Sequence, residues 1–107
     1  MRMVLVYTTL PDMAEVERIV STCMKRALAA CANYTEIRSM YVWKGELADD
    51  REVGVLFKTL PERRDGLVAA LKEMHPYETP AIIEIPAESL HDGYSHWMRD
   101  SCGAGDR

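Results

Sequence analysis

The sequence predicts a ferredoxin-like α+β fold, with elements in the order β-α-β-β-α-β and one more helix at the end. The tripeptide Thr-Leu-Pro occurs twice, at residues 9–11 and 59–61. An apolar run precedes each copy, and a segment with helical period follows it. A run rich in aromatic and β-branched residues lies between the copies. Two strand-helix units with a further strand between them are typical of this fold.

The first strand-helix unit begins with the apolar run Met-Val-Leu-Val-Tyr at residues 3–7. Thr9, Pro11 and Asp12 then form a helix-start signal. Threonine can cap free N–H groups, proline costs nothing in the first turn, and an acid suits the helix dipole. The apolar residues that follow at helical spacing are Val16, Ile19, Val20, Cys23 and Ala27.

The middle of the chain predicts an unusually long strand at residues 34–43. Neither Pro nor Gly interrupts the run from Cys31 to Lys44, and a strand of that length would reach about 45 Å at ~3.3 Å per residue. A compact domain of this size has a radius of gyration of about 13 Å, so the strand would overhang it. A bulge near residues 33–36 is the alternative that shortens the reach. We expect the chain to turn back at the polar residues 48–50.

The second strand-helix unit follows with an apolar strand at residues 53–57. Thr59 and Glu62 have the spacing of a capping box, which predicts a helix start. The helix that follows carries Leu67, Val68, Leu71 and Met74 at helical spacing.

Two more elements complete the predicted chain: a short apolar strand at residues 81–85 and a final helix at residues 90–102. In that helix, Leu90, Tyr94, Trp97 and Met98 recur at helical spacing. We expect its aromatic side to pack on the sheet or on a partner chain.

The predicted hairpin is apolar on both faces. Ile37, Tyr41 and Trp43 fall on one face, and Met40 and Val42 fall on the other. An exposed strand pair of this kind promotes aggregation unless another subunit covers it. The pattern therefore predicts a homo-oligomer in which the hairpin wraps a neighbouring subunit.

The length and the net charge of the chain limit the classes of function that are possible. A chain of 107 residues fits one domain at residues 1–107. The net charge of −4 argues against a protein that holds nucleic acid or an acidic membrane by bulk electrostatics. The N-terminal apolar run is too short for a signal peptide, and no apolar run is long enough to span a membrane. We expect a cytoplasmic protein.

The three cysteines do not suggest a disulfide framework or a zinc knuckle, because their number is odd and no Cys-x-x-Cys pair occurs. Cys23 lies on the apolar stripe of the first helix and is expected in the core. Cys102 lies in a Gly-rich segment that we expect to fray. Cys31, at the start of the second strand, is a functional candidate, although packing is the favoured interpretation.

Some functions of ferredoxin-like proteins lack their motifs in this chain. A copper chaperone would carry Cys-x-x-Cys in the first loop, where residues 8–11 are Thr-Thr-Leu-Pro. An RNA-binding version would need stacking aromatics and basic residues on its central strands. A small phosphatase would need a Gly-rich loop with an Arg to hold the anion. The sequence favours none of these three classes.

The segment His75-Pro76-Tyr77-Glu78-Thr79-Pro80 is the strongest candidate site. Its two prolines stiffen a loop that could hold His75, Tyr77 and Glu78 as a cluster. Imidazole and carboxylate together can bind a borderline metal or transfer a proton. In the structural interpretation, which we favour, His75 ends the helix, Tyr77 packs, and Glu78 bonds a neighbouring strand.

Several motifs together resemble the CutA family of divalent-cation tolerance proteins over nearly the whole chain. They are Thr9-Leu10-Pro11-Asp12, Leu28-Ala29-Ala30-Cys31-Ala32-Asn33, Ser39-Met40-Tyr41-Val42-Trp43-Lys44-Gly45-Glu46, Lys58-Thr59, the segment at residues 75–80 and Tyr94-x-x-Trp97. The resemblance implies a ferredoxin-like subunit in a tight homotrimer, similar to PII-type signalling proteins, with long hairpins joined edge to edge. Tyr41, Trp43 and Trp97 are the expected interface residues.

The resemblance also implies a role in metal tolerance and suggests a copper ligand. Members proposed to bind copper use a Cys before the first-loop Thr and a His-His pair before Pro-Tyr. Those positions are Thr8, Met74 and His75 in this chain. We therefore expect His75 to be the principal ligand for Cu²⁺. A site built between subunits would add Cys31, Tyr77 and Glu78.

Three hypotheses of function remain at this point. The favoured one is a trimeric copper-binding or regulatory module of metal tolerance that is not an enzyme. The second is a PII-like trimer that senses a small anion or nucleotide in its subunit clefts, although a Gly-rich phosphate loop or Lys/Arg cluster is not evident. The third is a hydrolase or isomerase that uses His75 with Glu78 or Tyr77.

Overall fold

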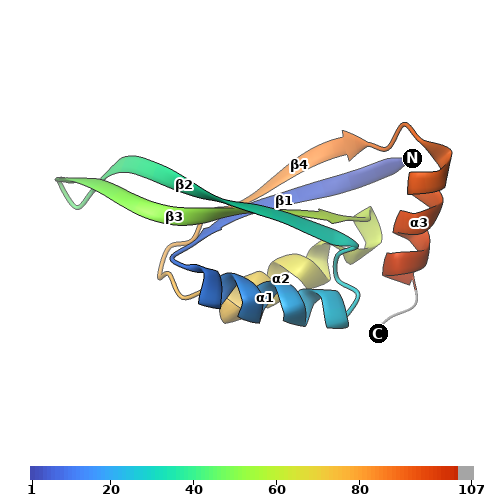
Figure 1. The fold of residues 1–107 in the computed structure, drawn as a ribbon, viewed down its shortest axis with the longest axis horizontal. Coiled ribbons are helices and arrows are strands. Elements are labelled where there is room, and N and C mark those ends of the chain that lie inside the picture. Colours follow the sequence, from blue (N-terminus) through green and yellow to red (C-terminus); the bar gives the residue numbers. More distant parts are fainter. Residues whose placement is uncertain (104–107) are drawn as a thin grey trace.

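Four antiparallel strands form one sheet in the spatial order β2-β3-β1-β4 in the computed structural model, which describes residues 1–103 (Figure 1). The predicted α+β order is confirmed. The predicted domain at residues 1–107 also includes residues 104–107, which lie outside the described part. The strands are β1 (Arg2–Leu10), β2 (Cys31–Trp43), β3 (Glu46–Thr59) and β4 (Ile82–Glu88). The helices are α1 (Met13–Lys25), the 3-10 turn η1 (Pro61–Arg63), α2 (Arg64–Met74) and α3 (Asp92–Gly103).

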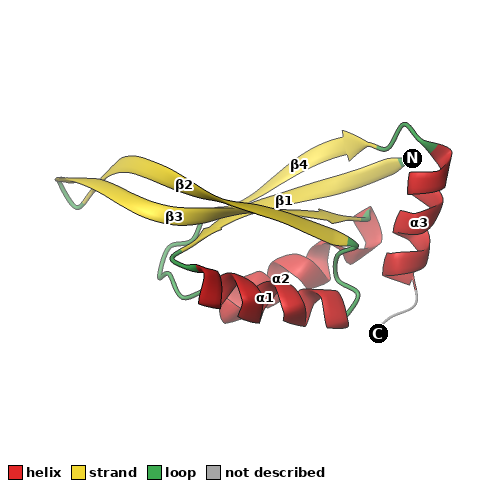
Figure 2. Cartoon of the chain, in the orientation of Figure 1, coloured by secondary structure: helices red, strands yellow, loops and turns green. Residues whose placement is uncertain are grey.

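Helices α1 and α2 cover one face of the sheet (Figure 2). Alternate residues of β1 point toward them, so that Val6 of β1 and its partner Phe57 of β3 are fully buried. From the helices, Ile19, Leu67 and Leu71 pack into the same core. Burial of each such side chain contributes about 1.5–3 kcal/mol. This core is the platform from which the hairpin and the segment after α2 project.

The β2–β3 hairpin is continuous and extends well past the helices (Figure 1). Its register runs without a shift from the pair Cys31–Lys58 to the pair Trp43–Glu46, so the bulge considered for residues 33–36 is wrong. The structure is 46 Å long along this direction. The turn lies at Lys44 and Gly45, not at residues 48–50, which belong to β3. Both turn residues have positive φ (50° and 79°), as two-residue I′ hairpin turns require.

The helix starts differ from the prediction. Asp12, not Thr9, caps α1, because its carboxylate accepts a hydrogen bond from the Glu15 N–H at 2.9 Å. The predicted capping box at Thr59 is wrong. Thr59 is the last residue of β3, fully buried, and its hydroxyl donates to the Leu28 carbonyl at 2.7 Å. Its side chain therefore joins the sheet to the loop after α1, and η1 leads into α2 instead.

Helix α1 ends at Lys25, so Ala27 lies beyond it although the pattern placed it on the helix stripe. Ala27 has a left-handed backbone (φ 53°) and is fully buried. Its N–H donates to the Met24 carbonyl, and the Leu28 N–H donates to the Cys23 carbonyl. These two bonds are those of a Schellman cap, which turns the chain toward β2.

Helix α3 packs at the end of the sheet opposite the hairpin (Figure 1). Met98 and Cys102 are buried there in a second apolar cluster with Met3. The expectation that Cys102 frays is therefore wrong, because α3 continues through it and the cluster covers its thiol. Trp97 stays partly exposed. None of the helices in the described part is long and apolar enough to cross a membrane.

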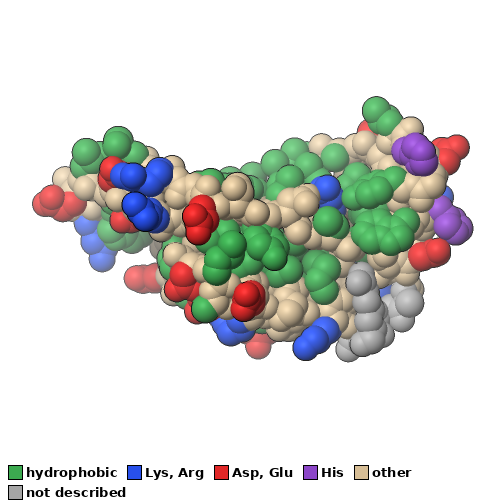
Figure 3. Space-filling view, viewed as in Figure 1, with side chains coloured by type: hydrophobic (Ala, Val, Ile, Leu, Met, Phe, Trp, Pro, Cys, Tyr) green, Lys and Arg blue, Asp and Glu red, His purple; other side chains and the backbone are tan. Residues whose placement is uncertain are grey.

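Large apolar side chains remain exposed on the hairpin. Met40, Val42 and Leu47 are 68%, 69% and 69% exposed, and Tyr41 and Trp43 are close to half exposed. Figure 3 shows hydrophobic side chains at the hairpin tip, among Lys, Arg, Asp and Glu side chains. This is the surface that the predicted oligomer would cover.

Candidate functional site

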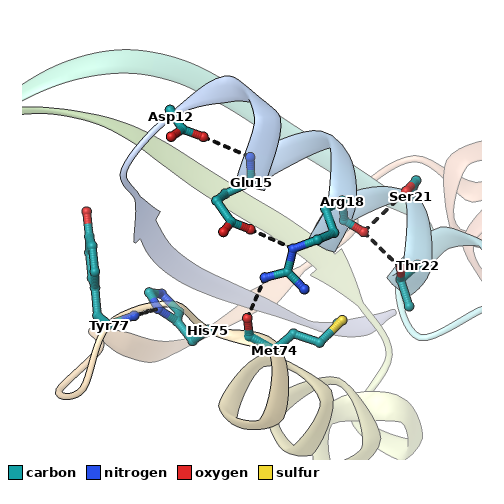
Figure 4. Close-up of polar contacts among 8 residues, drawn as sticks. All are labelled: Asp12, Glu15, Arg18, Ser21, Thr22, Met74, His75 and Tyr77. Carbon is teal, nitrogen blue, oxygen red and sulfur yellow. Dashed lines mark hydrogen bonds and ion pairs between the residues drawn. The ribbon is translucent and has the colours of Figure 1, made fainter.

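The segment after α2 is held in place by α1 (Figure 4). The His75 N–H closes α2 by donating to the Leu71 carbonyl at 2.9 Å, as the interpretation of His75 as a helix end predicts. Arg18 of α1 donates to the Met74 carbonyl at 2.7 Å, and its Nε also binds Glu15 at 2.6 Å. A cation at the C-terminal carbonyls suits the helix dipole. Arg18 thereby fixes where α2 ends and the segment begins.

Both ring nitrogens of His75 make hydrogen bonds within the chain. The Tyr77 N–H donates to Nδ1 at 3.1 Å, so Nδ1 carries no proton. In the neutral ring the proton is therefore on Nε2, which donates to the Thr8 hydroxyl at 3.0 Å. Burial lowers the pKa of His75, although a backbone hydrogen bond at Thr9 and the charges of Glu15 and Glu52 oppose that shift. Burial therefore favours the neutral form of the imidazole.

Tyr77 links the segment to the hairpin. Its hydroxyl donates to Glu52 of β3 at 2.6 Å, and its ring lies 5.0 Å from the His75 ring, centroid to centroid. Burial, together with the hydrogen bond to Glu52, raises the pKa of Tyr77. Next to this contact, the Tyr41 hydroxyl donates to Asp50 at 2.6 Å, and that bond raises the pKa of Tyr41. Both tyrosines are thus protonated donors to carboxylates.

A groove of about 560 Å³ lies between the hairpin and the segment after α2. Tyr41, Trp43 and Tyr77 provide its aromatic walls, and Glu78 is exposed at the segment side. The hairpin side provides the carboxylates of Asp50 and Glu52. The remaining lining residues are Thr9, Pro76, Thr79 and Ala81.

One chain brings together only part of the predicted cluster. Tyr77 and Glu78 line the same groove, but Cys31 pairs with Lys58, six residues along β3 from Glu52. That separation is roughly 20 Å at ~3.3 Å per residue. A cluster of Cys31 with Tyr77 and Glu78 therefore needs a second subunit, and it stays a prediction. The predicted interface residue Trp97 lies in α3, at the other end of the molecule.

The donor set of one chain does not fit a resident copper ion. The structure does bring together the three positions that the copper pattern uses, since Thr8 bonds His75 and Met74 precedes it. Their donors, however, are a hydroxyl, a thioether packed against the core, and an imidazole whose two nitrogens are already hydrogen-bonded. Within residues 1–103, no three His, Cys, Asp or Glu side chains are grouped to hold a metal.

Sequence reasoning missed a pair of arginines on the hairpin. Arg38 of β2 lies directly opposite Arg51 of β3. The pair lines a cavity of about 520 Å³ beside Asp12 and Met13 at the start of α1. A two-residue turn assigned at Gly45 would have given the register that pairs them.

Comparison with known proteins gives consistent matches over nearly the whole chain. Residues 4–101 match the family described as CutA1 divalent ion tolerance protein. The chain is 42% identical over 96 residues to the divalent-cation tolerance protein CutA of Pyrococcus horikoshii, covering 90% of this chain and 94% of the relative. It is 41% identical over 99 residues to the Thermotoga maritima protein of the same name, covering 92% and 98%.

Solved structures of similar proteins share the fold. CutA from Synechococcus elongatus has a TM-score of 0.91 at 31% identity, covering 94% of this chain and 90% of the other. A protein of Archaeoglobus fulgidus, described as a periplasmic divalent cation tolerance protein CutA, has a TM-score of 0.89 at 31% identity, covering 94% and 98%.

Proposed function

Because this chain belongs to the CutA1 divalent ion tolerance family, we propose that it serves divalent-cation tolerance as a homotrimeric regulatory module without catalytic activity. We propose further that Cu²⁺ binds at sites shared between subunits, with His75 as one ligand. The observation that carries the tolerance role is the family match over residues 4–101.

The donor geometry supports a shared site over one within a single chain. In the described part of the chain, the potential ligands do not form a group of three. Cys31 and Glu78 lie on separate parts of the surface, so two subunits can bring them together where one cannot. His75 would have to release Thr8 or Tyr77 to bind a metal, and that requirement favours modest affinity.

The sheet surface supports assembly. On the face opposite the helices, Leu5 pairs with Ile85 and Tyr7 pairs with Ile83, which form an apolar surface. Ile83 and Ile85 are exposed in the single chain. Strands β2 and β4 are the sheet edges and can pair with another subunit. An assembly that covers this face together with the hairpin buries the exposed apolar side chains and pairs the open strand edges.

The His75 contacts support a non-catalytic role. Thr8 and His75 have the spacing of a nucleophile and a base. The proton on Nε2 points toward the hydroxyl, however, so the imidazole cannot take the proton of Thr8. Thr8 is also fully buried, which keeps a substrate from reaching it.

Copper binding to the assembled protein tests the shared site. We expect His75→Ala to weaken Cu²⁺ binding at least tenfold in competition with a chelator, and to remove nitrogen coupling from the Cu²⁺ electron paramagnetic resonance spectrum. His96→Ala is the control, because His96 is exposed on α3 and pairs with Asp100 of the same helix. Equal effects of the two substitutions would contradict a role for His75.

A second candidate function, sensing of a small anion or nucleotide, is favoured by the Arg38–Arg51 pair. The cavity beside it reaches the start of α1, and its lining also includes the carboxylates of Asp12, Glu36 and Glu52, with which a bound anion must compete. Asp49 neutralises Arg38 in part, at 3.0 Å. A thermal-shift panel of nucleotides would reveal this function as stabilisation that Arg51→Gln removes. An unchanged melting temperature across the panel would exclude it.

We propose the cytoplasm as the compartment. Cys23 and Cys31 are free thiols, which suit a reducing environment. The relative from Archaeoglobus fulgidus is described as periplasmic, so the family alone does not decide the compartment. Cell fractionation of the native protein would test the proposal, and recovery in the periplasmic fraction would contradict it.

A further inference from the structure

Four residues from different parts of the fold form a chain of hydrogen bonds between the sheet and the hairpin. Thr8 of β1 accepts a bond from Nε2 of His75 at 3.0 Å. Nδ1 of the same ring accepts a bond from the Tyr77 N–H at 3.1 Å (Figure 4). The Tyr77 hydroxyl then donates to Glu52 of β3 at 2.6 Å. Tyr77 is therefore the residue that joins the His75 ring to the hairpin.

Glu52 lies where the hairpin leaves the body of the molecule. Pairing between β1 and β3 ends at the pair Leu10–Val53, so from Glu52 to the turn β3 is paired with β2 alone. A two-stranded hairpin is marginally stable in water on its own. The other side-chain hydrogen bonds of this overhanging part, residues 37–52, stay within the hairpin. Among the described residues, the bond from Tyr77 is thus the one side-chain hydrogen bond that ties the overhanging part to the body.

The two hydrogen bonds of Tyr77 depend on each other. Pro76 separates His75 from Tyr77, and its ring fixes one backbone angle between them. The Tyr77 ring also lies 5.0 Å from the His75 ring, centroid to centroid. Because the two rings and the Tyr77 N–H form one packed unit, displacement of Glu52 also loosens the bond to Nδ1.

We infer that Tyr77 is a latch through which the position of the hairpin controls the His75 imidazole. With the hairpin held, the Tyr77 N–H occupies Nδ1, the ring nitrogen that carries no proton. With the hairpin displaced, Tyr77 loses Glu52 and Nδ1 becomes free. The coupling is reciprocal, so a ligand that takes Nδ1 weakens the hold of Tyr77 on the hairpin. The latch rests on the proposed function for the role of His75 as a ligand, and it names what regulates that ligand.

Carbethoxylation of His75 by diethyl pyrocarbonate measures whether Nδ1 is free, because the reagent needs a ring nitrogen with a lone pair. Peptide mass spectrometry gives the rate at His75 and, in the same sample, at the exposed His96 of α3. We expect Tyr77→Phe to raise the His75 rate about three- to fivefold relative to His96, as the loss of a partly exposed charged hydrogen bond predicts. Tyr41→Phe is the matched control, because it removes a tyrosine–carboxylate bond of the same length within the hairpin. We expect its His75 rate to equal that of the wild type.

Substitutions on the hairpin side show whether the effect passes through Tyr77. Glu52→Gln weakens the acceptor of the latch, and Asp50→Asn makes the same acid-to-amide change two residues away on β3. We expect the first variant to raise the His75 rate and the second to leave it unchanged. In the Tyr77→Phe background we expect no further increase from Glu52→Gln, because the latch is already open. A direct effect of the Glu52 charge on the imidazole would persist in that background.

The latch would be overturned by an unchanged His75 rate in Tyr77→Phe, by equal rates in Tyr77→Phe and Tyr41→Phe, or by an effect of Glu52→Gln that persists without the Tyr77 hydroxyl. If Tyr77→Phe does not fold, the comparison of Glu52→Gln with Asp50→Asn decides the question.

The proposed function is tested by a separate signal, because the carbethoxylation assay contains no metal. Native mass spectrometry of the wild type with Cu²⁺ provides that signal. Faster reaction of His75 in Tyr77→Phe, together with nonsaturating copper uptake by the wild type, supports the latch and refutes the copper role. Saturating copper uptake, together with an unchanged His75 rate in Tyr77→Phe, refutes the latch and leaves the copper role standing.

Discussion

At the scale of single residues, Arg18 determines the position of the candidate site. Its guanidinium joins the middle of α1 to the last carbonyl of α2, one residue before His75. The ring of His75 is then held by two hydrogen bonds, to the Thr8 hydroxyl and from the Tyr77 N–H. A substitution of Arg18 should therefore loosen the segment at residues 75–80, although no residue of that segment is changed.

The Arg18→Gln variant tests this dependence. We expect a loss of about 1 kcal/mol in the free energy of unfolding, since a partly exposed charged hydrogen bond is lost. We also expect faster amide exchange at Tyr77, measured by hydrogen exchange. Arg99→Gln, on the exposed side of α3, is the control. Exchange at Tyr77 that is unchanged from the wild type would contradict the positioning role.

Cys23 gives a prediction about pH. Burial raises the pKa of its thiol from 9.0 to about 11. Between these values the folded thiol keeps its proton while the unfolded thiol loses it, so folded stability falls as the pH rises above about 9. We expect the wild type to lose about 1–2 kcal/mol more than Cys23→Ala between pH 8 and pH 10.5. Urea unfolding measures this, and parallel losses in the two proteins would be the contrary result.

Residue roles were predictable from sequence only where the pattern was local. The apolar stripe correctly placed Cys23 in the core, and the resemblance singled out His75. The hydrogen bond from Tyr77 to Glu52 spans 25 positions, so no local pattern could reveal it. The same holds for Thr59. Its neighbours in the sequence resemble those of a helix cap, but its side chain is buried in the sheet.

At the scale of elements, the hairpin turn is the most instructive part. The polar residues 48–50 looked like a turn, yet they continue β3. Gly45 decides the outcome because it adopts φ 79°, a conformation that most side chains resist. The turn position then sets the entire register of β2 against β3. Strand existence was thus predictable, whereas strand pairing depended on one backbone conformation.

Gly45→Val should destabilise the hairpin. A β-branched residue at positive φ is strained, and we expect a loss of about 1–2 kcal/mol in the free energy of unfolding. Glu46→Val is the matched control, since it introduces the same side chain one residue later, where the backbone is an extended strand. Chemical denaturation compares the two variants. If Gly45→Val were as stable as Glu46→Val, the turn assignment would lose its physical basis.

At the scale of the whole molecule, the proposed assembly would account for features that a single chain leaves unexplained. The hairpin projects beyond its own helices, and its tip exposes apolar side chains on both faces. The sheet face opposite the helices is apolar as well. Sequence reasoning could predict the overhang from the uninterrupted run, because strand length follows from residue number.

Trp43→Glu tests the contribution of the hairpin to assembly. A buried, unpaired carboxylate at a subunit interface is costly, so we expect this variant to be a monomer or an aggregate in size-exclusion chromatography with light scattering. Ser21→Glu adds the same charge on the exposed side of α1 and should remain a trimer. A folded, homogeneous trimer from Trp43→Glu would remove the hairpin from the interface.

The most direct test of the proposed function is native mass spectrometry of the reduced, metal-stripped protein titrated with Cu²⁺. It measures subunit number and metal stoichiometry in one spectrum. We predict a trimer that takes up Cu²⁺ to a saturating integer ratio, and a Trp43→Glu monomer that does not. Saturable uptake by the monomer would contradict shared sites. A trimer with only scattered, nonsaturating copper adducts would contradict the copper role.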